Sequence, residues 1–427
     1  MSARHRLSRA AFAAFALLVP AASASAQNVA ITNVKIIVGS GQVIDSGTII
    51  VRDGKIATVT GGSVQIPAGL QVIDAKGMSA MPGFIDGHKH LADGPTGKAW
   101  MQSLLEAGYT TVLIGGGPAE ANLALAKKIE SGEYNGPRAI PSGVVALRQT
   151  PLEARMAIQA LAQMGIKHTG EIGLTPEPAP PQAEIEVLKA IVDEAKKVGI
   201  QVNVHAVSSP AMVAAIDAGV TRLVHLPNKD WTSYEQADAV AKAGAIVAGL
   251  IAFGAPNIDT LSQGPAPVQW PKDNTARFRD GKGWPEAIVG ANRDAKGRAT
   301  GTEGGFTIIN ARRIWDADPN HTTISYSTDQ NADDLVVLEH ELKSFSIVFS
   351  MADIHRIIGP NAARFVGMAD QIGTLEAGKL ADIILLDGDP TKNIYEMLKT
   401  KVVLKEGKIV VDKRPAPITR SSRRAAP

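Results

Sequence analysis

Short apolar runs alternate with helix-length segments from Met81 onward. Eight of these runs have the length of strands: Gly83–Gly87, Thr110–Ile114, Arg138–Ser142, Ile166–Ile172, Ile200–Ala206, Thr221–Leu226, Ala245–Ile251 and Thr322–Thr328. Helical periodicity is clearest in four of the segments between them: Glu120–Ser131, Leu152–Gln163, Gln182–Lys197 and Tyr234–Lys242. Strands that alternate with helices form a parallel sheet, and eight such strands can close into a barrel. We therefore predict an α/β fold with a (β/α)8 TIM barrel over residues 81–368.

The two ends of the chain have a β pattern instead. Short strand-like runs fill residues 27–80, and Asp53-Gly54 between two of them is a hairpin signal. Three more runs near the C-terminus have the alternation of half-buried strands: Ala381–Leu386, Lys401–Leu404 and Gly407–Val411. We expect residues 27–80 and 369–415 to pair into one small composite β-sandwich beside the barrel.

Residues 1–26 have the organisation of a signal peptide. Three arginines precede an apolar stretch over residues 10–19, and Ala24-Ser25-Ala26 is a small-residue cleavage site. We expect cleavage after Ala26, with a cut after Ala24 as the alternative, and a periplasmic or secreted mature protein. An uncleaved anchor is less favoured, because the apolar stretch is too short to span a bilayer. No membrane span is expected in the mature chain.

The composition limits which metal ligands and which partners the protein can have. The chain has 427 residues and no cysteine, so packing rather than disulfides must hold the fold. Any metal must then bind to histidine or carboxylate side chains. Loss of the three arginines of residues 1–26 lowers the net charge from +2 to −1, which argues against nucleic acid as a partner. The basic tail, residues 416–427, is expected to be a solvated terminus. A homo-oligomer is compatible with this sequence.

One long segment lacks clear periodicity. Phe253–Thr302 is rich in Gly and Pro and contains Trp270 and Trp284. Loops of this length in compact domains are usually functional lids or disordered segments. In a barrel the segment would leave the rim that carries active sites. We interpret residues 253–302 as a rim insert that acts as a lid, with a plain surface excursion as the alternative.

The run Met81–Leu91, MPGFIDGHKHL, ends in two histidines. Alternate residues of a strand point to the same side, so His88 and His90 project together and Lys89 projects to the opposite side. Two imidazoles at a strand end can bind one divalent metal ion. Paired histidines are also common on surfaces, so a metal site requires matching ligands elsewhere in the chain.

Three helix-to-strand joints supply such ligands with one spacing. A glycine precedes a candidate ligand by six residues in each: Gly165 and Glu171, Gly199 and His205, Gly219 and His225. Each glycine fits the end of a helix, and the residues that follow fit one strand. The three side chains should therefore lie at equivalent heights at the C-terminal ends of successive strands. Either histidine alone could equally be a hydrogen-bonded core residue.

The roles of Glu171 and Asp329 each have an alternative interpretation. Lys167, as a carbamate, could replace Glu171 as a metal bridge, but Lys167 lies near the entry of its strand and Glu171 at the rim, so Glu171 is preferred. Asp329 directly follows the last strand, where a base is needed, and could instead be the N-cap of the next helix. His168 is expected to pack or to face a helix. The remaining histidines of this region are expected to be structural or exposed: His321, His340 and His355.

At these residues the chain resembles the metal-dependent amidohydrolase superfamily. The resemblance rests on the entry MPGFIDGHKH, on the ligand positions above, and on the exit IGTLEAGKLADIILLDGDP. The glutamate looks most like that of enamidase and its relatives, and the general pattern is also similar to the imidazolonepropionase-like and prolidase-like branches. Lys89 departs from the small or apolar residue usual between the two histidines, and we expect it to make an outward contact.

The resemblance implies a (β/α)8 barrel with a composite β-sandwich and a site for two divalent metals. By that resemblance the first metal is bound by His88, His90 and Asp329. The second is bound by His205 and His225, and Glu171 bridges the two. Zinc is the default metal for such ligands, with manganese, iron or cobalt as alternatives.

These expectations define an exported enzyme that hydrolyses a carbon–nitrogen bond in an amide. The substrate is a small molecule: a cyclic amide, an N-acyl amino acid or a dipeptide. A metal-bound hydroxide would attack the carbonyl, and Asp329 would carry the proton to the leaving nitrogen. Two alternatives stay open. One is a mononuclear deaminase or ring-opening hydrolase of the imidazolonepropionase type, and the other is a non-catalytic exported binding protein.

Overall fold

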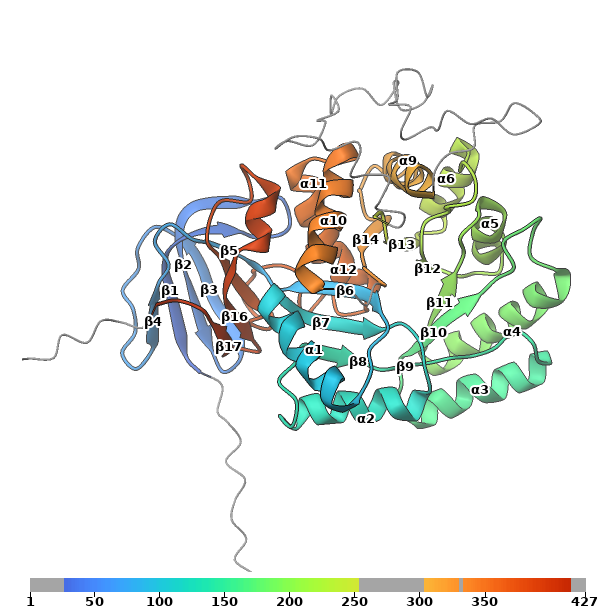
Figure 1. Cartoon of the computed structure of the whole chain (residues 1–427), viewed down its shortest axis with the longest axis horizontal. Helices are drawn as coiled ribbons and strands as arrows, with labels where there is room; N and C mark the ends of the chain where they lie inside the picture. Colours follow the sequence, from blue (N-terminus) through green and yellow to red (C-terminus); the bar gives the residue numbers. More distant parts are fainter. Residues whose placement is uncertain (1–26, 253–302, 330–332, 416–427) are drawn as a thin grey trace, which may run out of the picture.

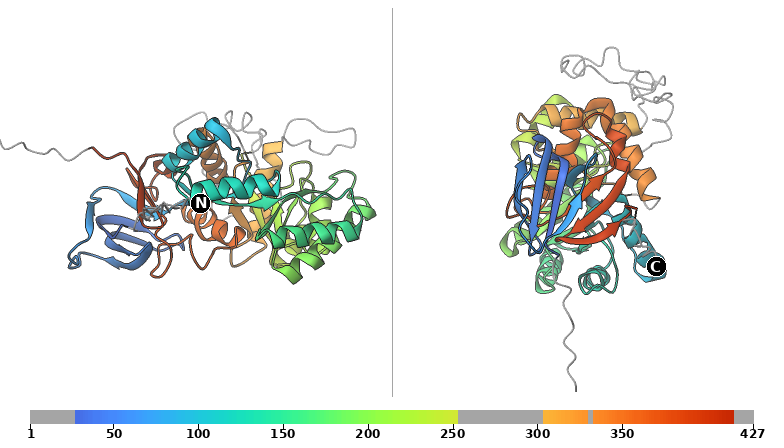
Figure 2. Two further views of the ribbon diagram at one scale, coloured as in Figure 1. Left: turned by 90° about the horizontal axis from the view of Figure 1, so that it is seen from below. Right: turned by 90° about the vertical axis from the view of Figure 1, so that its left-hand side faces the viewer.

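The computed structural model describes residues 27–252, 303–329 and 333–415. A small β domain lies at one end of the long axis, and a larger α/β body fills the rest (Figures 1 and 2). The predicted signal peptide, the rim insert 253–302 and the basic tail 416–427 lie outside the described residues. No helix in the described ranges combines the length and apolarity needed to cross a membrane.

The β domain is one continuous sheet built from both ends of the chain. Its strands are β1 (Val29–Ile37), β2 (Val43–Arg52), β3 (Lys55–Gly61), β4 (Gln71–Asp74), β5 (Ser79–Pro82), β15 (Ile383–Leu386), β16 (Thr400–Lys405) and β17 (Lys408–Asp412). Their order is β17-β16-β15-β5-β1-β2-β3, with β4 paired to β1. The two ends of the chain meet where β5 and β15 pair antiparallel, with Met81 opposite Ile384. The predicted pairing of the two termini is confirmed.

Tight turns set the register of two hairpins in this sheet. Asp53 and Gly54 join β2 to β3 with φ angles of 49° and 80°, and Glu406 and Gly407 join β16 to β17 with 49° and 73°. Two consecutive left-handed residues match the twist of the flanking strands, which is why such sequences favour hairpins. The turn expected at Asp53-Gly54 is therefore present.

Strand β15 joins the two parts of the molecule. Ile383 and Leu385 belong to the apolar core of the β domain, whereas Ile384 and Leu386 pack into the core of the α/β body. The expectation of a half-buried strand was wrong here, because the sheet lies against the body and leaves neither face of β15 exposed. A strand buried on both faces reads as a continuous apolar run, as this one does.

The α/β body contains a parallel strand at each of the eight predicted positions. The strands are β6 (Phe84–Lys89), β7 (Tyr109–Ile114), β8 (Arg138–Ile140), β9 (Ser142–Gly143), β10 (His168–Gly173), β11 (Gln201–His205), β12 (Arg222–Val224), β13 (Ile246–Gly249) and β14 (Ile324–Tyr326). The third predicted strand is divided at Pro141 into β8 and β9. Parallel pairing runs through β6-β7-β8 and through β9 to β14. The Asp329 amide donates to the His88 carbonyl at 2.9 Å and links the segment after β14 to β6. The predicted TIM-barrel fold class is confirmed.

Helices surround these strands (Figure 1). Their bounds are α1 (Gly94–Ala107), α2 (Ala119–Glu130), α3 (Pro151–Gln163), α4 (Gln182–Val198), α5 (Ser209–Asp217), α6 (Tyr234–Lys242), α9 (Glu303–Asp316), α10 (Asp334–Val348), α11 (Met351–Arg356), the π-helix η2 (Ile357–Asn361), α12 (Ala362–Phe365) and the 3-10 helix η3 (Ile394–Leu398). Gly165, Gly199 and Gly219 follow α3, α4 and α5 with φ of 79°, 72° and 89°. Only glycine adopts this region without strain, so these positions fix where each helix stops and the next strand begins.

Candidate metal centre

The six side chains proposed as ligands come together at the C-terminal ends of the parallel strands. They come from five segments: His88 and His90 at the end of β6, Glu171 in β10, His205 at the end of β11, His225 directly after β12, and Asp329 shortly after β14. The C-terminal face of such a barrel is where active sites form. The structure thus brings together every side chain of the proposed set, and their role as ligands stays a prediction.

Glu171 lies at the centre of this group. Its Oε1 is 3.2 Å from His90 Nε2, and its Oε2 is 2.8 Å from His205 Nδ1. Oε2 also lies 3.4 Å from His225 Nε2 and 3.6 Å from His88 Nε2. Each of the four imidazoles therefore directs a nitrogen at one carboxylate, which is the position that a bridging ligand would occupy.

Asp329 lies close to three of these four histidines. Its Oδ1 is 3.4 Å from His88 Nε2 and 3.2 Å from His90 Nε2, and its Oδ2 is 3.8 Å from His225 Nε2. Two overlapping groups result, each with ligand atoms within 4.8 Å of one another: His88, His90 and Asp329, and His88, Glu171 and His225. His205 lies outside both groups, but its ring centroid is 4.4 Å from that of His225.

Two of these residues have an unusual backbone conformation. His225 has φ of 68° and Asp329 has φ of 49°, in the left-handed region that residues with a Cβ seldom adopt. Backbone hydrogen bonds hold both, from His225 N to the Ala248 carbonyl at 3.1 Å and from Asp329 N to the His88 carbonyl at 2.9 Å. Such strain persists where the surrounding structure enforces it, commonly at functional sites. No pattern in the sequence indicated it.

Two glycines after β7 lie against the rings of His88 and His90 and leave no room for a side chain. A Cβ on Gly115 would lie 2.4 Å from Cε1 of His88, and a Cβ on Gly116 would lie 2.7 Å from Cε1 of His90. The Gly115 carbonyl also accepts a hydrogen bond from the Glu171 amide at 2.8 Å. Neither glycine was predicted from the sequence to belong to the site. The signal was the run Gly115-Gly116-Gly117 directly after a predicted strand.

The cluster holds its two carboxylates in the ionised form. Burial alone would raise the pKa of Glu171, but hydrogen bonds from His205, His225 and His90 outweigh it and hold that pKa far below its usual range. The pKa of Asp329 is likewise lowered, because His88 and its neighbours outweigh the opposing effect of burial. Both carboxylates are therefore anionic at neutral pH.

The pKa values of two of these histidines are shifted in opposite directions. The hydrogen bond to Glu171 raises the pKa of His90, a half-exposed residue at the mouth of the site. Burial lowers the pKa of His225 and favours its neutral form. Neutral imidazole is the form that binds metals.

One buried nitrogen atom of the cluster indicates whether a metal ion fits the site. His88 Nε2 is buried and forms no hydrogen bond with the described residues, although carboxylate oxygens lie 3.4 and 3.6 Å away. A buried polar atom without a partner is costly, and an ion shared with the neighbouring carboxylates would satisfy it. Four imidazoles with two carboxylates are a donor set for zinc or another first-row divalent metal. The residues present fit a divalent metal ion.

The structure shows where Lys167, Asp329 and His168 lie relative to their alternative roles. Lys167 is exposed and precedes β10, so it does not reach the cluster that contains Glu171. The N-cap of α10 is Asp333, whose side chain accepts from the Leu335 and Val336 amides, so Asp329 does not supply that cap. His168 packs in the interior, as expected, with Nε2 3.2 Å from the Val366 carbonyl.

Lys89 makes its contact away from the histidines, as expected, but inside the protein. Its side chain leaves the histidine side of the strand, but it is only 1% exposed and does not reach the surface. It ends 3.1 Å from Thr328 Oγ1 and 3.3 Å from Asp334 Oδ1. The outward contact is therefore internal, because Trp100 of α1 and Asp334 of α10 lie against the Lys89 side chain.

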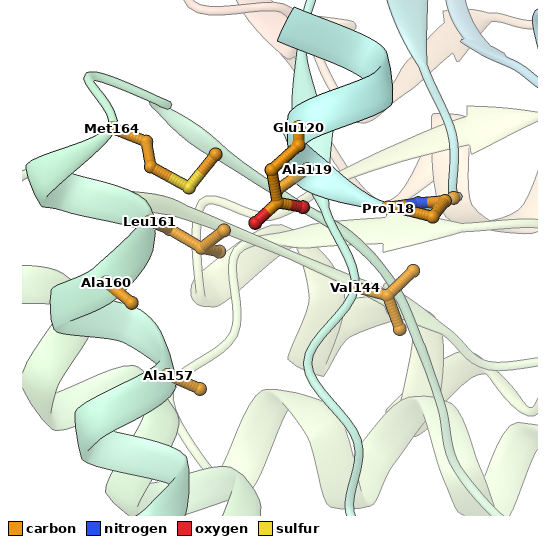
Figure 3. Close-up of a pocket in the computed structure, with 9 residues that line it drawn as sticks. Pro118, Ala119, Glu120, Val144, Ala157, Ala160, Leu161 and Met164 are labelled. Atoms are coloured by element: carbon orange, nitrogen blue, oxygen red, sulfur yellow. The ribbon is translucent and has the colours of Figure 1, made fainter.

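A separate cavity lies between α2 and α3. It measures about 530 Å³, and it is lined mainly by apolar side chains of the two helices and by Val144 (Figure 3). None of the six clustered residues lines it, so we do not assign it to the metal centre.

Comparisons with known proteins identify relatives of this chain and similar folds. The chain is 32% identical over 185 residues to an enamidase from Eubacterium barkeri, a match that spans 38% of this chain and 45% of the enamidase. Thus less than half of that relative is covered. The fold superposes on a Xaa-Pro dipeptidase with bound methionine, with a TM-score of 0.69, 20% identity, and coverage of 90% of this chain and 99% of the other.

A second solved structure, a putative prolidase from Bifidobacterium longum, superposes with a TM-score of 0.69 and 21% identity over 91% of this chain and 97% of the prolidase. At this identity the two structures establish the fold alone. The family comparison is broader, because the amidohydrolase family matches residues 79–410 and so includes the whole cluster. The chain belongs to the amidohydrolase family.

Proposed function

We propose that this protein is a metal-dependent hydrolase that cleaves a carbon–nitrogen bond of an amide. The observation that carries the proposal is the convergence of four imidazoles and two ionised carboxylates, Glu171 and Asp329, at the barrel rim. Membership of the amidohydrolase family supports the same reaction class.

Two divalent metal ions, by default zinc, would share the cluster. His88, His90 and Asp329 would hold one ion, His205 and His225 would hold the other, and Glu171 would contact both. A bound ion of this kind polarises a carbonyl and lowers the pKa of water toward neutrality.

The protein's own groups would move the proton and hold the site in one arrangement. Asp329 is ionised at neutral pH and its side chain is 17% exposed, so it can accept a proton from the attacking water. The same carboxyl can then donate that proton to the leaving nitrogen. The buried rings of His88 and His225 cannot swing into solvent, which keeps the site in one arrangement.

For the substrate we propose a small cyclic amide, an N-acyl amino acid or a dipeptide. The support is indirect: one relative is named an enamidase, and a structural neighbour is named a Xaa-Pro dipeptidase. We also propose export of the chain with cleavage after Ala26, which N-terminal sequencing of the mature protein tests. A mature protein that retains residues 1–26 would contradict export by this route.

The experiment combines chelation with a substrate screen. Purified protein is screened against a library of cyclic amides, N-acyl amino acids and dipeptides, then stripped of metal and reconstituted with Zn²⁺, Mn²⁺ or Co²⁺. We expect hydrolysis that disappears on stripping and returns on reconstitution, and a loss of activity in Asp329→Asn. Full activity after complete metal removal would contradict the proposal, and one ion per chain with deaminase activity would favour the mononuclear alternative.

A further inference from the structure

A buried polar cluster lies behind the metal centre, on the helix side of β6. Lys89 is at its middle, with Nζ 3.1 Å from Thr328 Oγ1 and 3.3 Å from Asp334 Oδ1. The same ammonium lies 5.2 Å from the centroid of the Trp100 ring, and Trp100 Nε1 donates to Asp334 Oδ1 at 3.2 Å. Lys89 and Asp334 are each only 1% exposed.

Thr328 connects this cluster to the centre. Its Oγ1 donates to Asp86 Oδ2 at 2.6 Å, while its amide donates to Asp86 Oδ1 at 3.1 Å. Asp86 Oδ1 also accepts from the His88 amide at 3.1 Å. Because Thr328 precedes Asp329, these contacts attach the Asp329 segment to the strand that carries His88.

Two of the residues that Lys89 contacts lie on either side of Asp329 in the sequence. Thr328 comes directly before it, and Asp334 is the first residue of α10. Asp329 itself has a φ of 49°, a conformation that the surrounding structure has to enforce. One ammonium therefore holds the chain before and after a residue whose backbone is strained.

We propose that Lys89 is a positioning residue, which fixes the carboxylate of Asp329 toward His88 and His90 by anchoring Thr328 and Asp334. The proposal rests on the proposed function in so far as Asp329 is a ligand. A buried ion pair contributes little net stability relative to apolar residues of the same size, so stability is a weak reason for placing a lysine here. Holding a neighbouring segment in one arrangement is a role that an apolar residue at this position could not fill.

The experiment separates positioning from stability by measuring binding of Co²⁺ to metal-free protein, together with thermal unfolding. We expect Lys89→Met to weaken Co²⁺ binding about 10- to 100-fold, the usual cost of losing a partner that orients a ligand. Thr328→Val removes the same contact together with the hydrogen bond from Thr328 to Asp86, and should weaken binding at least as much. The double variant of Lys89 and Thr328 should bind less than additively worse than the two single variants, because the hydrogen bond between these side chains is lost in each of them.

Two further variants complete the design. The double variant Lys89→Met/Asp334→Asn removes both members of the buried Lys89–Asp334 ion pair, so it should regain part of the thermal stability lost in Lys89→Met without regaining Co²⁺ affinity. Arg138→Met is the matched control, because it breaks the Arg138–Asp382 ion pair of 2.7 Å far from the centre. It should lower stability and leave Co²⁺ affinity unchanged.

Wild-type Co²⁺ affinity in Lys89→Met would overturn the proposal, as would recovery of affinity together with stability in Lys89→Met/Asp334→Asn. If Lys89→Met does not fold, Thr328→Val decides, and wild-type affinity there overturns the proposal. Failure of the proposed function is distinguishable from these outcomes. In that case wild-type protein hydrolyses no amide, whereas the Co²⁺ affinities still report whether Lys89 positions the site.

Discussion

Substitution of Gly115 by alanine tests how closely the histidine rings fit the backbone beneath them. The added methyl carbon would lie 2.4, 2.6 and 2.8 Å from Cε1, Nδ1 and Nε2 of His88. Carbon atoms pack best at about 3.5–4.0 Å, so the ring would have to move by about 1 Å. His88 is only 1% exposed and β6 is buried along its length, which leaves the ring no route toward solvent.

The expected cost follows from that displacement. Overpacking of a filled site destabilises by about 1–3 kcal/mol. A misplacement of about 1 Å at a reacting centre costs about 100-fold in rate. We therefore expect Gly115→Ala to fold with reduced stability, to lose about 100-fold in kcat/KM, and to bind Co²⁺ more weakly. The assays are steady-state hydrolysis of the best amide from the screen, metal titration and chemical denaturation.

Two other glycines serve as controls. Gly116→Ala would approach Cε1 of His90 to 2.7 Å, but the His90 side chain is 40% exposed and can yield, so its loss should be smaller. Gly173, at the end of β10, has nothing within 4 Å of an added Cβ, so Gly173→Ala should behave like wild type. Wild-type activity and metal affinity in Gly115→Ala would refute the reasoning, because His88 would then not be held against this backbone.

Three further predictions concern Glu171 and buried residues elsewhere in the fold. Glu171→Gln should lower the bound metal from about two ions per chain to about one, as measured by elemental analysis, whereas unchanged metal content would favour a mononuclear site. Burial lowers the pKa of His168 to about 3 and that of His355 to about 4, from 6.5. Each is neutral in the folded state while the unfolded chain binds a proton below pH 6.5, so stability should fall as the pH drops from about 6.5 toward 4. Each proton contributes a slope of about 1.4 kcal/mol per pH unit, and denaturation of His168→Asn across this range should show a slope smaller by about that amount. Tyr326→Phe leaves the buried Tyr109 hydroxyl without its 2.6 Å partner and should cost about 1–3 kcal/mol in the free energy of unfolding, part of which Tyr109→Phe in the same chain should restore.

The parts of the structure that the sequence predicted are those set by local geometry. Gly165 ends a helix because only glycine adopts its left-handed backbone without strain, and counting six residues along the following strand places Glu171 at the rim. The same counting from Gly199 places His205 beside it. The eight strands were found because strand and helix periods differ in the pattern of apolar residues.

The parts that the sequence did not predict depend on which elements pack against one another. The sequence predicts an outward contact for Lys89 but not its partners, because Trp100 and Asp334 come from two other elements of the fold. Strand β15 reads as half-buried unless one knows that the β domain lies against the barrel. The fit of Gly115 against His88 is a distance between neighbouring strands, and no periodicity along the chain encodes it.

The central claim is that one cluster of imidazoles and carboxylates binds metal. Crystals of zinc-loaded protein, with anomalous diffraction recorded on both sides of the zinc absorption edge, test it most directly. The account predicts two anomalous peaks, one beside His88, His90 and Asp329 and the other beside His205 and His225, with Glu171 between them. Anomalous density elsewhere in the chain, or none at this cluster in zinc-loaded crystals, would contradict it.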